Sequence, residues 1–388
     1  MSEARSIAPA PEMPPAWVRS PCELTDLGLR LARARRVALD TESNSLHHFP
    51  EQVCLLQVAE EDGRISLVDP LALGILDPLA AAFGSPAVIK VLHGAAYDLS
   101  SLKRDFGFAF AGIFDTMLAA QFLGLPEVGL SALLQRYFGI APGVSRQKDD
   151  WTVRPLRPDQ EAYAAADVRW LLALRTRLGE ELEARGRHAW VEEECKALAA
   201  LLPAERAFDP EDALRLKGAS QLDSRGLAIL RELFTARQAW AHETGRPPFR
   251  VLGNDTLLAL AGARPRGPED LGGLPGMTPR AIARYGAGIL RAVARGEAVP
   301  DETLPVRTRP KRPRVAAAVE RRTAALSAWR AQAASRFSLD PGLLLPRRLI
   351  EQLAELLPHD TEGLAGVPGF RRWRVEAFGH EILRILAG

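Results

Sequence analysis

Cysteine, long apolar runs and an excess of charge of one sign are all scarce in this sequence. Its three cysteines, Cys22, Cys54 and Cys195, are odd in number and far apart, which argues against a disulfide framework or a cysteine-based zinc site and favours a reducing compartment. No stretch approaches the roughly 18 uninterrupted apolar residues of a membrane-spanning helix. The N-terminus lacks the basic flank and apolar run of a signal peptide. We therefore expect a cytoplasmic protein with no membrane segment.

The overall charge leaves the class of partner open. A formal net charge of +2 over 388 residues neither requires nor excludes a polyanionic partner, so local clusters of charge must decide. Apolar residues make up 47% of the chain, which is enough for a hydrophobic core and argues against global disorder. A chain of this length accommodates about two or three domains of ordinary size.

The first half of the sequence alternates between strand-like and helix-like patterns. Short apolar runs predict strands at residues 37–41, 53–59, 65–68, 87–92 and 112–114. Apolar residues at helical spacing predict helices at residues 73–83, 99–106, 130–137 and 158–185, and another that begins at residue 115. Strands first in a meander, and then in strand–helix–strand order, predict a mixed sheet with helices on its faces.

Four acidic residues stand at positions where they could meet. Asp40 and Glu42 lie two residues apart at the end of the first predicted strand, so both side chains point to one face. Asp98 follows the fourth predicted strand, at the start of the next helix. Asp167 lies four residues after Tyr163, so these two residues share one face of their predicted helix.

Each of these residues also has an ordinary structural role open to it. An acid at a strand end or helix start is commonly solvated or caps the helix, and capping is the favoured interpretation of Asp98 taken alone and of Asp115. Tyr163 could be an amphipathic-helix residue with a half-buried ring. For Asp40 and Glu42 the alternative is weaker, because two like charges on one face of an apolar strand repel each other unless a hard cation neutralises them.

Four clustered carboxylates would suit two divalent cations. In phosphodiester hydrolysis one ion activates the attacking water and the other, about 3.5–4 Å away, stabilises the leaving 3′-oxygen. Tyr163 could orient that water through its hydroxyl, one helical turn before Asp167. The acidic pattern is therefore typical of a metal-dependent nuclease.

Residues 139–155 form a polar segment that is long for a plain connection, which makes it a candidate functional loop. Basic side chains near an aromatic ring suit a single-stranded 3′ end, by phosphate pairing and base stacking. The candidate RNA-binding residues are Gln147, Lys148, Trp151 and Arg154 in this loop, with His93 after the fourth predicted strand. Anchoring of the loop to the core is the alternative for Trp151, and a local hydrogen bond is the alternative for His93.

Beyond residue 205 the sequence is helical and repeats itself. A shift of 93 residues aligns Arg237 with Arg330 and residues 273–276 (GLPG) with residues 366–369 (GVPG), without a gap. We interpret this as two tandem copies of one helical module of roughly 80 residues. Arginines near these turns could meet phosphates, although a plain helix–helix turn is an equal alternative. Between the copies, residues 300–315 predict an extended basic linker.

Taken together, these segments resemble the DEDD exonuclease superfamily, and within it the DEDDy branch that includes ribonuclease D. The matching segments are LDTE (39–42), HGAAYDL (93–99), FDTMLAAQFLG (114–124), QKDDWTVRPL (147–156) and YAAADV (163–168). The two C-terminal copies resemble the HRDC (helicase-and-RNase-D C-terminal) domain. The sequence departs from the pattern at Gly94, where many members have Asn, and at residues 143–146, where relatives often carry lysines.

The resemblance implies an α/β catalytic domain with an RNase H-like mixed sheet, followed by two small all-α HRDC-like domains. It implies Asp40, Glu42, Asp98 and Asp167 as ligands of two divalent ions, Mg²⁺ or Mn²⁺, and Tyr163 as the residue that positions water. The implied activity is a 3′→5′ exoribonuclease that releases nucleoside 5′-monophosphates from structured RNA 3′ ends, tRNA precursors especially.

The expected order of domains is a loose leader, an exonuclease domain, a first HRDC-like domain, a basic linker and a second HRDC-like domain. Their expected bounds are residues 1–20, 21–200, 205–298, 299–316 and 317–388. A monomer is expected. Two alternatives stay open: the same chemistry on DNA, because HRDC-like modules also occur with DNA helicases, and a catalytically idle RNA-binding scaffold. Contacts to the 2′-hydroxyl would separate RNA from DNA, and a sequence does not show them.

Overall fold

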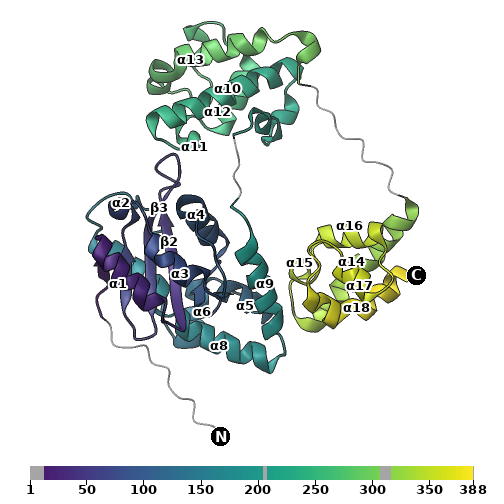
Figure 1. The fold of residues 1–388 in the computed structure, drawn as a ribbon. Coiled ribbons are helices and arrows are strands. Elements are labelled where there is room, and N and C mark those ends of the chain that lie inside the picture. The colour runs from purple at the N-terminus through teal and green to yellow at the C-terminus, as the bar shows by residue number, and fades with distance from the viewer. Residues whose placement is uncertain (1–12, 204–207, 306–315, 388) are drawn as a thin grey trace. The chain divides into compact units, whose positions relative to one another are not determined.

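The computed structural model describes residues 13–203, 208–305 and 316–387, which fall into two compact units (Figure 1). The first unit takes in described residues within 1–42, 53–203 and 314–388, and the second takes in those within 43–52 and 204–313. The expected basic linker lies largely outside the described residues. Within the described ranges, no helix combines the length and the apolar character that crossing a membrane requires.

A six-stranded mixed sheet forms the centre of the first unit, with the strand order β1-β4-β3-β2-β5-β6. The strands are β1 (Ala16–Val18), β2 (Arg36–Ser43), β3 (Val53–Glu60), β4 (Ile65–Val68), β5 (Ile89–Leu92) and β6 (Ile113–Asp115). β3 and β4 pair antiparallel, whereas β1 with β4, β2 with β5 and β5 with β6 pair in parallel. β2 and β3 are buried along most of their length, as strands covered on both faces are. The expected mixed sheet is confirmed.

Helices pack on the faces of this sheet (Figure 1). They are α1 (Pro21–Leu31), α2 (Pro70–Leu73), the 3₁₀ turn η1 (Asp77–Leu79), α3 (Ala80–Gly84), α4 (Ala96–Phe106), α5 (Thr116–Phe122), α6 (Leu130–Phe138), α7 (Pro158–Arg169), α8 (Leu171–Ala184) and α9 (His188–Ala200). Asp115 caps α5 as expected, because its carboxylate accepts hydrogen bonds from the backbone N–H groups of Met117 and Leu118.

The expectation of a loose leader over residues 1–20 is wrong at its C-terminal end. Ala16–Val18 forms β1, which pairs with β4, and Ser20 caps α1 by accepting a hydrogen bond from the backbone N–H of Glu23. A three-residue edge strand is too short to show a period in the sequence. Residues 1–12 lie outside the described part of the chain.

Two helices are also interrupted where the sequence pattern predicts continuity. The helix expected at residues 73–83 is divided, because Gly74 has a positive φ of 74° and Pro78 stands in the first turn of η1. The helix expected at residues 158–185 is divided at Trp170, where φ of −103° separates α7 from α8. The apolar positions keep the same spacing through both breaks, so periodicity alone does not reveal them.

The C-terminal half contains two copies of one helical arrangement. The first copy holds η2 (Pro210–Arg215), η3 (Ala219–Gln221), α10 (Ser224–Thr244), α11 (Pro248–Val251), α12 (Asn254–Ala263), η4 (Pro268–Leu271), α13 (Pro279–Glu297) and η5 (Asp301–Thr303). The second holds α14 (Ala317–Phe337), α15 (Pro341–Leu344), α16 (Arg347–Leu356), α17 (Thr361–Ala365) and α18 (Arg372–Ala387). The repeat extends to hydrogen bonds: Arg237 Nη1 donates to the Leu252 carbonyl at 3.0 Å, and Arg330 Nη1 donates to the Leu345 carbonyl at 3.1 Å.

The second helical copy belongs to the first unit because it packs against α9. The rings of Trp190 on α9 and Trp373 on α18 stack with their centroids 4.7 Å apart. The Glu193 carboxylate accepts from the backbone N–H groups of Arg372 and Trp373, at 2.7 and 2.9 Å, at the start of α18. A carboxylate at a helix N-terminus is favoured by the helix dipole, so the contact is both apolar and electrostatic.

Candidate active site

β2 carries the first two predicted acids at the end of its buried run. Val37, Ala38 and Leu39 are fully buried in the middle of the sheet, and the strand continues through Asp40 and Glu42. Alternate residues of a strand share one face, so the two carboxylates project to the same side of the sheet.

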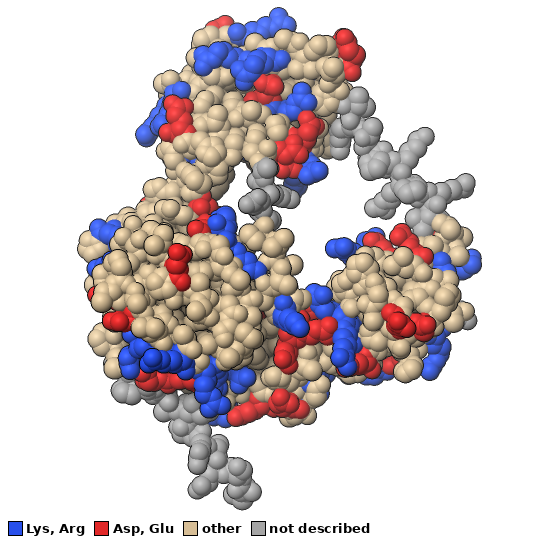
Figure 2. Space-filling view, viewed as in Figure 1, with Lys and Arg blue, Asp and Glu red and all other residues tan. Residues whose placement is uncertain are grey.

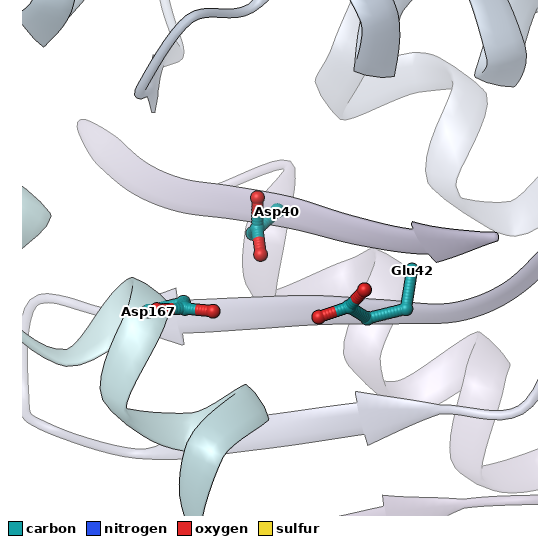
Figure 3. A group of neighbouring side chains, drawn as sticks. All are labelled: Asp40, Glu42 and Asp167. Atoms are coloured by element: carbon teal, nitrogen blue, oxygen red, sulfur yellow. The ribbon is translucent and has the colours of Figure 1, made fainter. Parts of the chain in front are cut away.

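Asp167 reaches these two acids from α7, which packs on β3 and β4. Each of Asp40, Glu42 and Asp167 offers a carboxylate oxygen that lies within 4.8 Å of the oxygens offered by the other two. Figure 3 shows the three side chains between the strand and the helix that carry them. The predicted convergence of these three acids, which are remote in the chain, is confirmed. We call them the acidic group.

Asp98 borders the acidic group from the first turn of α4. Gly94, with φ of 71°, turns the chain from the end of β5 into that helix. Asp98 is 6% exposed and accepts a hydrogen bond from the Thr41 hydroxyl, on the residue between Asp40 and Glu42. Its carboxylate is not one of the three that come within 4.8 Å of one another. Its charge nevertheless raises the pKa of both Asp40 and Glu42, so it lies in the same region.

The electrostatics of these four carboxylates are unfavourable without a cation. Burial first, and then the charges of the neighbouring acids, raises the pKa of Asp40 well above its usual range and the pKa of Glu42 to about 9. Burial raises the pKa of Asp98 to about 7 and that of Asp167 to about 6. Within the part of the chain that the structure describes, no Lys or Arg forms an ion pair with any of the four. Their oxygen donors therefore fit hard divalent cations, which would supply the missing positive charge.

Tyr163 lies beside the acidic group on α7. Its hydroxyl is close enough to the Asp167 and Glu42 carboxylates for their charges to act on it, and its ring lies 6.2 Å from that of Trp151. Burial and the charges of Asp167 and Glu42 raise the pKa of Tyr163, so the side chain stays a neutral phenol. The ring is half-buried, as the structural alternative supposes, and the residue stands one helical turn before the predicted metal ligand Asp167 on α7.

Two contributions to the site, one from Asp115 and one from Asp149, were not found from the sequence. The Asp115 carboxylate, beyond its capping of α5, accepts from the backbone N–H groups of Gly94 and Ala95, both at 2.9 Å. It thereby fixes the turn that presents Asp98. The charge of Asp149, in the 139–155 loop, adds to the rise in the pKa of Glu42. Neither role has a signal in spacing or composition, because both depend on contacts between segments.

Two predicted RNA-binding residues, Trp151 and Arg154, have structural roles. Trp151 is fully buried, in a small core with Cys54, Leu55 and Leu67, so it is unable to stack on a base without leaving that core. The Arg154 guanidinium forms a bidentate pair with Asp69, at 2.7 and 2.9 Å, and donates to the carbonyls of Trp151 and Cys54. The prediction for Trp151 is therefore wrong, whereas the Arg154 side chain is held by Asp69 but stays 23% exposed, so its role in RNA binding stays a prediction.

The other three candidates differ in exposure. Gln147 and Lys148 are exposed on the loop, so their predicted role stays a prediction. His93 is half-buried, with Nδ1 2.9 Å from the Thr116 hydroxyl oxygen, and that hydroxyl donates to the Leu92 carbonyl. His93 Nδ1–H is therefore the donor to Thr116. This geometry supports the local hydrogen bond that was the alternative for His93, and not a contact to RNA.

Comparison with known proteins places the two halves of the chain in known families. Residues 15–183 match the 3′–5′ exonuclease family, and residues 226–293 and 319–386 each match the HRDC domain. The crystal structure of Escherichia coli RNase D, described as an exoribonuclease involved in structured RNA processing, superposes with a TM-score of 0.71 at 26% identity. That superposition covers 97% of this chain and 99% of the other.

Sequence relatives extend over nearly the whole chain. Ribonuclease D of Pseudomonas paraeruginosa is 32% identical over 97% of this chain and 98% of its own length. Ribonuclease D of Acidiphilium cryptum is 32% identical over 98% of this chain and 95% of its own length. With the motif order, the sheet and the two helical copies in agreement, the chain belongs to the ribonuclease D family of 3′→5′ exoribonucleases.

Proposed function

We propose that the chain hydrolyses RNA from its 3′ end at the acidic group, releases nucleoside 5′-monophosphates, and acts on tRNA precursors and other structured RNAs. The observation that carries the proposal is the convergence of Asp40, Glu42 and Asp167 within 4.8 Å, bordered by Asp98, with no cationic partner in the described residues. A location in the cytoplasm and a monomeric state stay predictions.

Two divalent ions, Mg²⁺ or Mn²⁺, are part of this proposal. Asp40, Glu42 and Asp167 would hold one of them, and Asp98 together with Asp40 would hold the other. Bound ions supply positive charge at the phosphate and lower the pKa of the attacking water. Tyr163, as a neutral phenol beside Asp167, orients that water through its hydroxyl oxygen.

The two helical copies present their arginines differently, which bears on how RNA is held. Arg280, Arg284 and Arg291 are exposed on α13 of the first copy, and no ion pair involves them in the described residues. Their spacing places them along one side of the helix. Figure 2 shows basic and acidic side chains intermixed over much of the visible surface. We therefore assign the holding of RNA phosphates to α13 of the first copy.

The arginines at the start of α18 in the second copy are engaged within the protein. Arg374 is 4% exposed and pairs with Glu194 of α9 at 2.7 Å, and Arg371 pairs with the same glutamate at 3.2 Å. Arg372 pairs with Glu376 at 2.7 Å. In this proposal the second copy serves as a support for the exonuclease domain.

A side-by-side digestion tests the proposed reaction. The full chain would be incubated with RNA and DNA of one sequence, each labelled at its 5′ end, in Mg²⁺, Mn²⁺ or EDTA. The proposal expects stepwise shortening of RNA from the 3′ end, 5′-mononucleotide products and no reaction in EDTA. Equal rates in EDTA would refute the metal site, and faster shortening of DNA would refute the RNA substrate.

A further inference from the structure

A pocket lies on the first unit where β2 and β5 begin, away from the end of β2 that carries the acidic group. It has a volume of about 380 Å³ and is lined by Arg35, Arg36, Ala87, Ile89 and Arg175. β2 and β5 begin here, with Arg36 and Ile89 in register, whereas Asp40 and Glu42 follow toward the other end of β2. Four residues of extended strand separate Arg36 from Asp40, which is about 13 Å. The pocket is therefore distinct from the acidic group.

The arginines of this pocket carry more positive charge than the neighbouring carboxylates neutralise. Arg36 Nε pairs with Glu61 at 2.9 Å, and its Nη1 donates to the Thr176 hydroxyl at 3.4 Å. Arg35 is exposed, and no ion pair involves Arg35 or Arg175 in the described ranges. One carboxylate thus faces three guanidinium groups.

Arg175 gives an independent sign that an acceptor belongs in the pocket. Its Nε atom is buried and has no hydrogen-bond partner in the structure. Its guanidinium lies 5.3 Å from the centre of the Phe114 ring, which holds it in place by a cation–π contact. Burial, and then repulsion from Arg36, lowers the pKa of Arg175, while Glu183 opposes that shift only weakly. The terminal nitrogens of Arg175 are not buried, and no hydrogen bond involves them in the described residues, so these donors remain available to an anion in the pocket.

We propose that Arg35, Arg36 and Arg175 form a phosphate-binding site separate from the acidic group. Guanidinium groups match phosphate oxygens in charge and in hydrogen-bond geometry, and the apolar walls at Ala87 and Ile89 leave the arginines as the polar contacts. Two sources supply such a phosphate: the backbone of an RNA, at a position away from its 3′ end, and a free nucleoside 5′-monophosphate. The first source rests on the exoribonuclease function, and the binding of phosphate itself does not.

Thermal denaturation of the full chain in EDTA tests the site directly, because EDTA removes metal-dependent binding at the acidic group. Inorganic phosphate should raise the Tm above that in chloride of equal ionic strength, since a ligand that binds only the folded state stabilises it. Arg35→Ala, at an exposed position, and Arg175→Gln should abolish the rise. Arg177→Gln is the matched control, because Arg177 lies on the same helix and pairs with Glu180 outside the pocket.

A rise of equal size in all variants, or none in the wild type, would overturn the proposal.

The two possible sources of the phosphate are then distinguished by measuring RNA binding in the Asp40→Asn background, which prevents digestion. If the source is RNA, adding Arg35→Ala should reduce the slope of log affinity against log salt by roughly 0.7 for one lost single-strand phosphate contact. If the source is a free nucleotide, that slope stays unchanged and a nucleoside 5′-monophosphate raises the Tm of the wild type but not of Arg35→Ala. Absence of both effects would also contradict the proposal.

Discussion

At the scale of single residues, we expect substitution of Asp40 to cause a large loss of turnover at the acidic group. Asp40→Asn keeps the shape of the side chain and removes one charge from the group. Because loss even of an indirect metal-site partner costs about 10–100-fold in activity, we expect more than about a 100-fold loss of turnover. RNA binding should be largely retained, as measured by gel shift beside digestion of 5′-labelled RNA. Asp62→Asn, in the exposed turn after β3, is the control. Wild-type turnover by Asp40→Asn would remove this residue from the site.

Tyr163→Phe removes a hydroxyl and leaves all four carboxylates in place. The hydroxyl lies near the Asp167 carboxylate, whose charge acts on it, so its loss should cost about 10–100-fold in kcat, less than the loss of a ligand. Single-turnover digestion would measure this, with metal affinity expected to change little. A loss as large as that of Asp40→Asn would mean that Tyr163 contributes more than orientation.

The raised pKa values of the four acids predict how stability depends on pH without metal. In the folded chain the pKa of Glu42 is about 9, that of Asp98 about 7 and that of Asp167 about 6, against ordinary values of 4.5 for Glu and 3.8 for Asp. The folded state therefore binds more protons than the unfolded state between about pH 4 and pH 9. The Tm of metal-free protein should fall as the pH rises through this window.

Divalent ions should reverse that trend, because they hold the acids in their ionised form. Thermal denaturation from pH 4 to pH 9, with EDTA and with Mg²⁺, would measure both effects. The gain in Tm from Mg²⁺ should increase with pH. A gain that is constant across the range would show that the ions bind away from these carboxylates.

The convergence of Asp40, Glu42 and Asp167 could be predicted because their spacing and motif order are properties of the sequence itself. The surroundings of Trp151 and Arg154 could not be predicted, because an aromatic residue beside basic residues gives the same sequence pattern whether its ring is exposed or buried. The position of the Arg154 side chain depends on Asp69 and Cys54, which contact it from distant segments of the chain. Asp115 was interpreted correctly as a cap, but its bonds to Gly94 and Ala95 required the fold.

At the scale of elements, the 139–155 loop is attached to the sheet through Arg154 and Asp69. Asp69 is 2% exposed, so Asp69→Asn leaves the Arg154 charge with only carbonyl acceptors. Breaking one partner of a buried pair costs about 3 kcal/mol of unfolding free energy. Urea unfolding would measure it, with Arg64→Met, which breaks the exposed pair with Asp62, expected to cost under about 1 kcal/mol. Equal small losses would show that this attachment contributes little.

Element types were more predictable than element ends. The strands at residues 53–59 and 65–68 and the helix at residues 130–137 agree with β3, β4 and α6 almost to the residue, because their apolar runs end at turn residues. The breaks at Gly74 and Trp170 occur where apolar residues keep a regular helical spacing. The backbone conformation of a single residue ends the helix there without changing that spacing. The edge strand β1 is defined by its partner β4 and not by its own three residues.

At the scale of the whole molecule, the two helical copies should respond differently to loss of their arginines. Simultaneous replacement of Arg280, Arg284 and Arg291 by Ala should weaken RNA binding and reduce the salt slope by up to about 2–3, with little change in Tm. Arg374→Ala should instead lower the Tm, because this side chain also donates to the carbonyls of Leu343 and Leu344. Filter binding across a salt series and thermal denaturation separate the two effects. The reverse pattern would exchange the roles assigned to the copies.

The packing of α9 also limits how the chain can be shortened. A truncation after Glu180, within α8, would remove Val191 and Cys195, both fully buried. It would also leave Phe122 without the Trp190 ring that it meets edge-on. Point substitutions in the helical copies are therefore a cleaner comparison than truncation.

A titration of the metal-free full chain with Mn²⁺, followed by the electron paramagnetic resonance of the free ion, examines the cation site without reference to any substrate. Saturable binding of two ions by the wild type is the expected result, with loss of at least one ion in Asp40→Asn and none in Asp62→Asn. Unsaturable binding, or the same stoichiometry in the wild type and Asp40→Asn, would contradict a cation site built on Asp40, Glu42, Asp98 and Asp167.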